Sequence, residues 1–427
     1  MKKARLAALL VSGGLCTASS ALAQAPSAGG TPPAVAAPPA PASPAVEEGN
    51  LFRFYGLIIP RVVISDRAVE SFGQPNAVAI TAAGHPVLSV SPDRARYSFQ
   101  VAQSRAGLWV NEKGPVRGQL EVDFVDFTKA TPTVASLPRL RLARVDYTFH
   151  PGHTLALGQD WDLHSPLNPH LINLVGNLFQ AGNSGFMRQQ FKYLYSAPSF
   201  ELGAAVGFPA PNVTAKEAAL ELAALPTLAV RGAYKFGKSR VGVSAIATRL
   251  TFNLEAPDER VGNAFAAVLF SELAATATTQ VRLELNYGQN TANLGLLTLA
   301  QGHTAQDVRE VGGFLSVRHV MDKHAVYGMA GYQKVLEPET VLPSYSYPGP
   351  PQAEPSFGTA VLAGTGPGMH YNGAARLGYE FKPLSALAFI VEGFFHRSRF
   401  QLQAVDEARV DPVRSALGIE TGAVFSF

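Results

Sequence analysis

Cysteine is almost absent from this chain of 427 residues. The only one is Cys16, close to the N-terminus. The remainder of the chain therefore forms no internal disulfide and offers no cysteine-ligated metal site. Its fold has to be held together by packing, hydrogen bonds and ion pairs.

Long apolar runs are missing after the first segment, although 47% of the residues are hydrophobic. A membrane-spanning helix needs about 20 consecutive apolar residues, so the sequence predicts none there. An excess of positive charge is missing too. Once Lys2, Lys3 and Arg5 are set aside, the basic residues equal the 32 acidic ones. That balance gives no support for nucleic acid as a partner.

The first two segments carry targeting and spacer signals. In residues 1–23, Lys2, Lys3 and Arg5 precede an apolar run that ends on small residues. This is the order of a secretory signal peptide and predicts export. Residues 24–50 are rich in proline and alanine and nearly devoid of large apolar side chains. We expect a disordered spacer there, because such a segment cannot bury a core.

From Leu51 to Phe427 the pattern is that of strands with two different faces. Glu284 and Asn286, for example, alternate with Leu283 and Leu285, which is the period of a strand. We count about sixteen such segments. They lie near residues 51–64, 98–110, 116–127, 139–149, 153–161, 188–197, 199–208, 226–236, 240–252, 262–275, 279–288, 311–321, 324–334, 369–381, 386–401 and 415–427.

The connections between these segments alternate between short turns and long loops. This sorting is typical of an all-β, transmembrane up-and-down antiparallel β-barrel. In lipid every backbone polar group needs a partner, so the sheet must close on itself and the last strand must pair with the first. The chain ends on SALGIETGAVFSF, which alternates in the same way. Residues 51–427 are therefore predicted to form one barrel domain.

Five predicted strands carry distinctive sequences, namely FRFYGLIIPRV (52–62), GPVRGQLEVDF (114–124), RLRLARVDYTF (139–149), LALGQDW (155–161) and RQQFKYLY (188–195). These stretches resemble strands of Gram-negative outer-membrane porins, and specifically of the DcaP-like family. The resemblance implies a sixteen-stranded homotrimer in the outer membrane that passes small, often anionic, solutes. It also implies contact with outer-membrane lipid and lipopolysaccharide. The terminal phenylalanine resembles the signal that the barrel-assembly machinery reads.

Residues 162–187 follow the predicted fifth strand, where the resemblance implies a third long loop that folds into the barrel. The segment includes Leu171, Leu174 and Phe179, and is too apolar for a loop in water. It is therefore the candidate constriction, although an external loop packed on its neighbours remains the alternative. Its candidate site residues, with Asp160 just before it, are Asp162, His164 and His170.

Charged residues in the strands are expected to line the lumen, because arginine facing lipid at mid-membrane costs about 2–4 kcal/mol. Many of them should form ion pairs with each other and brace the wall. Early-strand arginines slightly outnumber the acids, which favours a weak preference for anions or carboxylates. The candidate pore-lining residues in the strands are Arg53, Arg61, Arg105, Arg117, Glu121, Asp123, Arg141, Arg144, Arg188, Lys192, Arg282, Glu284 and Arg376.

The leading hypothesis is a passive diffusion channel for small hydrophilic solutes, with no cofactor and no enzymatic activity. A barrel with a plugged lumen and a structural or adhesive role stays open, as does a soluble β protein. A barrel hydrolase would need a Ser/His/acid cluster, which the histidine positions do not assemble. His150 and His153 flank a turn without further metal ligands nearby, so no metal site is predicted.

Overall fold

The computed structural model describes residues 51–67, 69–71, 74–78, 95–124, 138–171, 178–185, 187–208, 226–252, 260–296, 298–300, 306–338, 369–400 and 413–427. The predicted signal peptide (1–23) and spacer (24–50) lie outside these residues. So do parts of the long connections, including residues 172–177 of the candidate constriction. The statements that follow concern the described residues.

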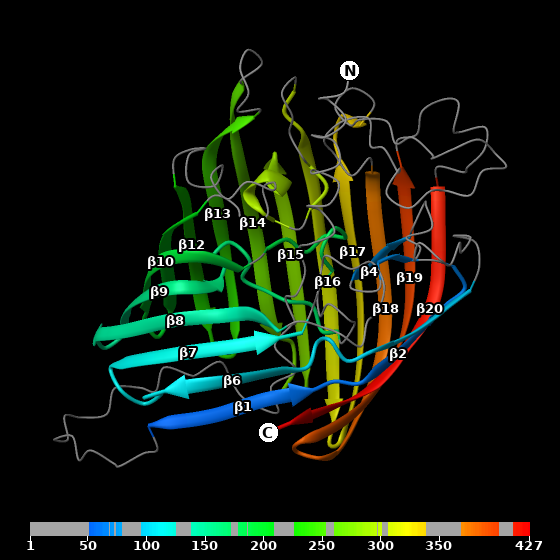
Figure 1. Ribbon diagram of the computed structural model, residues 1–427, viewed down its shortest axis with the longest axis horizontal. Helices are drawn as coiled ribbons and strands as arrows, with labels where there is room; N and C mark the ends of the chain where they lie inside the picture. The colour runs from blue at the N-terminus through cyan, green and yellow to red at the C-terminus, as the bar shows by residue number, and fades with distance from the viewer. Residues whose placement is uncertain are drawn as a thin grey trace.

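The chain forms one closed antiparallel sheet (Figure 1). Its strands are β1 (Phe52–Ile58), β2 (Arg61–Ser65), β5 (Arg96–Gln100), β6 (Arg105–Val110), β7 (Val116–Asp123), β8 (Arg139–His150), β9 (His153–Trp161), β10 (Met187–Ser196), β11 (Phe200–Gly207), β12 (Thr227–Phe236), β13 (Ser239–Phe252), β14 (Arg260–Ala274), β15 (Thr279–Gln289), β16 (Arg309–Met321), β17 (His324–Val335), β18 (Met369–Leu384), β19 (Leu387–Phe400) and β20 (Val413–Ser426).

These 18 segments make sixteen spanning strands, because the first two strands are each interrupted once. β1 and β2 are separated by Ile59 and Pro60, and β5 and β6 by residues 101–104. The two interruptions face each other, and the Ile59 N–H donates to the Ser104 hydroxyl oxygen at 3.0 Å. Proline has no N–H to give to a ladder, so an interruption at Pro60 is expected on chemical grounds.

The barrel closes where β20 meets the first strand. Phe425 pairs with Ile58 in β1, and Thr421 pairs with Val62 in β2. The final residue takes part, since Phe427 exchanges two backbone hydrogen bonds with Gly56, at 3.0 and 3.2 Å. In Figure 1 the C-terminus accordingly lies beside β1. The predicted strand count, pairing and closure are confirmed.

Alternation of burial along each strand separates an outer from an inner face. On β15, Leu285 and Tyr287 are exposed while Glu284 and Asn286 are buried. The same rule leaves a belt of large apolar side chains exposed on the outside of nearly every strand. Such a belt is the surface that a membrane barrel presents to acyl chains.

Two short elements complete the description. A hairpin of β3 (Val69–Ser71) and β4 (Gln74–Val78) lies near β18, β19 and β20. A single 3-10 turn, η1 (Thr291–Leu294), follows β15. Within the described ranges, no helix has the length and apolar character needed to cross a membrane.

The outward assignment of Leu285 predicts a depth-dependent penalty. Leu285→Arg should lower the free energy of unfolding by about 2–4 kcal/mol, because it places a charge in the middle of the lipid belt. Leu273 also faces outward but lies at the end of β14, next to a short turn. Leu273→Arg should cost only about 0–1 kcal/mol. Unfolding in lipid vesicles measures both, and equal penalties would contradict the assignment of the faces.

Candidate functional site

The connection after β9 contacts the inner wall on the far side of the barrel. The His170 backbone N–H donates to Ser316 Oγ on β16 at 2.7 Å. The Asn286 amide of β15 donates to the Gly182 carbonyl at 2.8 Å, and the Asn372 amide of β18 to the Gln180 carbonyl at 3.1 Å. The described parts of this connection, residues 162–171 and 178–185, are named loop A below. Loop A therefore spans from β9 to strands across the lumen.

Apolar packing and close backbone contact hold loop A in place. Leu167, Leu171 and Leu178 belong to a buried cluster with Phe270 and Phe314 on the inner face of the sheet. The backbone approaches so closely that a Cβ on Gly331 would lie 2.1 Å from the Ala181 carbonyl oxygen. Only glycine leaves room for that approach. The inner wall under loop A is thus apolar around Phe270 and Phe314 and polar where Asn286, Ser316 and Asn372 bond to the loop.

A second connection also folds against the inner wall, which the sequence analysis did not predict. Leu294 and Leu296, just after β15, pack with Ile246 and Leu250 of β13 and with Leu163 of loop A. Residues 290–296 and 298–300 are named loop B. Its sequence, NTANLGL followed by TLA, is too apolar for a loop in water. This is the same signal that identified loop A, and it would have found loop B.

Arg188 joins the two loops. Its side chain is 2% exposed and forms a fork with Asp162 of loop A, at 2.6 and 3.2 Å. The same guanidinium donates to the Leu294 carbonyl of loop B at 2.6 Å and to the Phe208 carbonyl at 2.5 Å. A rigid fork of donors suits this set of planar acceptors, which a lysine could not match. Arg188 and Asp162 therefore position both loops rather than face the passage.

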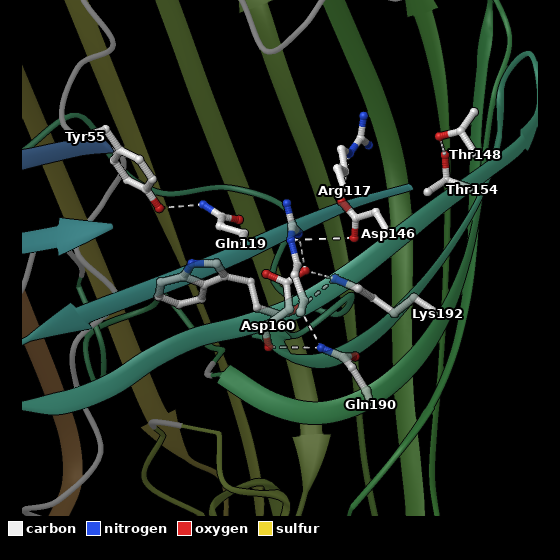
Figure 2. Close-up of polar contacts among 11 residues, drawn as sticks. Tyr55, Arg117, Gln119, Asp146, Thr148, Thr154, Asp160, Gln190 and Lys192 are labelled. Atoms are coloured by element: carbon white, nitrogen blue, oxygen red, sulfur yellow. Dashed lines mark hydrogen bonds and ion pairs between the residues drawn. The ribbon is translucent and has the colours of Figure 1, made fainter. Parts of the chain in front are cut away.

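The wall that loop A leaves uncovered carries polar side chains from β1 and β7–β10 (Figure 2). The Gln119 amide donates to the Tyr55 hydroxyl at 2.7 Å, and Arg117 pairs with Asp146 at 3.1 Å. Asp160 accepts from Arg144 at 2.5 Å and also from Lys192. Figure 2 shows Tyr55, Gln119, Asp160 and Lys192 pointing toward one another. They come from neighbouring strands at matching register, so the pairing of the ladder sets their spacing.

The other predicted wall residues occupy three further networks. Toward the long-loop side, Glu121 and Asp123 pair with Arg105, Arg139 and Arg141. At the closing seam, Glu420 bridges Arg61 at 2.8 Å and Arg376 at 3.3 Å, and Arg376 also pairs with Glu392. On β15, Arg282 pairs with Glu272 at 2.8 Å and donates to the Asn168 carbonyl of loop A.

Two predicted residues stand apart from these networks. Arg53 lies at the short-turn rim, where it pairs with Glu112 at 2.5 Å. Glu284 is fully buried beneath loop A and forms no ion pair with the residues that the structure describes. The seam residues Arg61 and Arg376 are likewise buried, so in this structure they brace the wall and do not meet the passage.

In most of the described ion pairs of the lumen, the basic side chain is more exposed than its carboxylate partner. Arg117 is 34% exposed and its partner Asp146 5%, while Arg144 is 22% exposed and Asp160 6%. Arg318 and Glu380 repeat the pattern at 20% and 2%. Among the described pairs, Glu201 is an exception, because it is 26% exposed and its partner Arg240 is 23% exposed. Water in the lumen therefore contacts more positive than negative charge, although the formal charges nearly balance.

Comparison with known proteins gives matches at the level of structure. No family model matches the sequence, and no curated protein matches it. The outer-membrane channel DcaP of Acinetobacter baumannii superimposes with a TM-score of 0.62 at 12% identity, over 88% of this chain and 97% of that one. The chain has the porin fold. The predicted resemblance to DcaP-like porins is confirmed for the fold.

Two further porins share the fold. OprB of Pseudomonas putida has a TM-score of 0.52 at 11% identity, over 88% of this chain and 94% of that one. An anion-selective porin from Comamonas acidovorans has a TM-score of 0.50 at 11% identity, with coverage of 88% and 99%. The porin fold thus accounts for the barrel.

Removing the Arg188 guanidinium should destabilise the protein strongly. Arg188→Met leaves Asp162 buried without its partner, which costs about 3–5 kcal/mol. The double variant Arg188→Met with Asp162→Asn removes both charges and should recover part of that loss. Unfolding free energies of the two single variants and the double variant form the test. Additive losses would show that Arg188 and Asp162 do not stabilise each other.

Acid should loosen loop A. Burial, with Arg188 nearby, lowers the pKa of His164 to about 3, and burial, with Arg282 nearby, lowers the pKa of His170 to about 3. Both rings are therefore neutral in the docked loop. Docking is fully stable above the ordinary histidine pKa of about 6.5 and weakens as the pH falls from there toward about 3.

Single-channel recordings measure this effect as current noise. We expect noise to rise on acidification in the native protein and to rise less in the His164→Gln/His170→Gln variant, whose side chains do not titrate. An identical pH response in both proteins would assign the effect to carboxylates.

Proposed function

We propose that the chain is an outer-membrane porin, a passive diffusion channel for small hydrophilic solutes with a weak preference for anions and carboxylates. The observation that carries the preference is the exposure of Arg117, Arg144 and Arg318 beside buried carboxylates. Selectivity in such a passage depends on the charges that water and solute can reach.

The composition of the candidate constriction supports the same preference. Residues 162–187 contain one carboxylate, Asp162, and no lysine or glutamate. Asp162 is 1% exposed and paired with Arg188, so its charge is neutralised away from the passage. His164 and His170 of loop A are buried and uncharged in the docked loop, whereas Arg117 and Arg144 of the wall are partly exposed. Nothing in loop A repels an anion.

The remaining parts of the proposal follow from export and from the fold. The signal peptide would deliver the chain across the inner membrane, and the terminal Phe427 would present it to the barrel-assembly machinery. The mature protein would sit as a homotrimer among outer-membrane lipid and lipopolysaccharide. Another porin-fold protein, OmpT of Vibrio cholerae, is described in a trimer form. The proposed role requires no cofactor and no enzymatic step.

A plugged barrel with a structural role is the second candidate, and one observation favours it. Loops A and B fill the barrel on the side of β12–β20 with apolar contacts to the wall. Single-channel conductance in planar bilayers separates the two candidates. Stable conductance steps support the porin, whereas silence from a protein that is folded and inserted supports the plug.

Charge removal at the exposed arginines tests the ion preference. Arg117→Gln and Arg318→Gln should each lower the ratio of anion to cation permeability by about two- to fivefold, since a unit charge at 4 Å in water is worth about 1 kcal/mol. Reversal potentials in a salt gradient measure the ratio. Arg249 on β13 is exposed on the outer face and serves as the matched control. A shift of equal size in Arg249→Gln would contradict the role of the inner arginines.

A further inference from the structure

A buried group of side chains beneath loop A, called the pocket below, has a surplus of hydrogen-bond acceptors. Both carboxylate oxygens of Glu284, Oδ1 of Asn183 and Oε1 of Gln333 are buried and receive no hydrogen bond. All three side chains are fully buried, with an exposed fraction of 0%. Buried polar atoms are normally satisfied, so four unsatisfied oxygens in one region require an explanation.

The fold brings these oxygens together through Asn286. The Asn286 amide donates to Gly182 of loop A at 2.8 Å, and its oxygen accepts from Gln333 Nε2 at 3.0 Å. Gln333 reaches across Gly312, which lies between the two in register and whose Cβ would sit 1.8 Å from Gln333 Oε1. A side chain at position 312 would therefore close the pocket.

Glu284 lies two residues along β15 from Asn286, on the same inner face. Its carboxylate faces the Asn183 amide and the Ser184 N–H of loop A, yet neither contact reaches hydrogen-bond geometry. The pocket is thus formed by β15, β17 and loop A together. A ligand bound in the pocket would therefore contact both loop A and the inner wall.

Among the residues that the structure describes, no base pairs with the Glu284 carboxylate. Arg282, the nearest base on the same strand, is engaged by Glu272 at 2.8 Å and by the Asn168 carbonyl at 2.9 Å. A buried carboxylate without a partner is very costly. An occupant of this pocket should therefore carry one positive charge and need no acceptor beyond the oxygens already present.

We propose that the pocket binds a monovalent metal cation, with sodium as the fitting ion. Carboxylate and amide oxygens are the ligands that hard cations prefer. Glu284 is the carboxylate there that receives no hydrogen bond, because Glu310 beside Gln333 accepts from Thr291 and from the Leu299 and Ala300 N–H groups. One unsatisfied carboxylate balances one positive charge, so the pocket suits a monovalent ion better than calcium. The bound ion joins loop A to β15 and β17 from inside the pocket, and it holds the loop whether or not the passage conducts.

Thermal unfolding of the full protein in detergent tests the site. The two media are sodium chloride and N-methylglucamine chloride at equal ionic strength and pH. At a sodium concentration of about 100 times the dissociation constant, binding contributes about 2.7 kcal/mol, so we expect the melting temperature to rise by several degrees. Sodium, potassium and caesium chloride should give graded values, because the pocket has a fixed size.

Two variants make the test specific. Glu284→Gln removes the charge at nearly constant shape and should abolish the dependence on sodium. Glu272→Gln is the control, because Glu272 pairs with Arg240 and Arg282 outside the pocket, and it should keep the dependence. The ion series on the native protein decides the matter if Glu284→Gln does not fold.

Two results would overturn the proposal. One is the same melting temperature in every salt, which would mean that a proton or a water molecule satisfies the pocket. The other is a sodium effect of equal size in Glu284→Gln, which would place the ion elsewhere. Neither result depends on conductance. Recordings in planar bilayers therefore test the proposed porin function independently of the cation site.

Discussion

A sheet that spans lipid has to satisfy its last edge with its first, and in this chain that pairing joins β20 to β1 and β2. Every other feature depends on it. Closure leaves one apolar face toward acyl chains and one face toward an enclosed space. The chain can then concentrate charge in that space, because water and oppositely charged neighbours stabilise arginines there that lipid would exclude.

The inner wall of the barrel is partly apolar on one side and polar on the other. On the side of β12–β20 the inner wall carries side chains such as Phe270 and Phe314, which pack against loop A in the manner of a soluble core. On the side of β1 and β7–β10 the wall remains polar, with Tyr55, Arg117 and Asp160 among its residues (Figure 2). The protein thus combines a packed half and a wet half, and the two meet at loop A.

Strand positions and closure were predictable because the two-residue period and the sorted loop lengths are local properties of the sequence. The ion-pair partners of the wall residues were not predictable, because they depend on the register between neighbouring strands. Arg188, for instance, was predicted to line the pore, yet pairing puts it beside Asp162 and Leu294 at 2% exposure. Glu284 was predicted on its correct face, but its lack of a partner depends on Arg282 turning to Glu272 and to the Asn168 carbonyl, which the sequence does not show.

The buried network at the seam has a consequence for how the barrel is completed. Glu420 lies on the last strand, while Arg61 lies on the first and Arg376 on β18. Until β20 docks, the two guanidinium groups face the interior without that carboxylate. When β20 docks, it forms the backbone hydrogen bonds to β19 and to the first strand and places Glu420 beside Arg61 and Arg376 in the same step. A fifteen-stranded intermediate would therefore leave Arg61 without its ion-pair partner, although Arg376 would keep Glu392 of β19, and such an intermediate should be unstable.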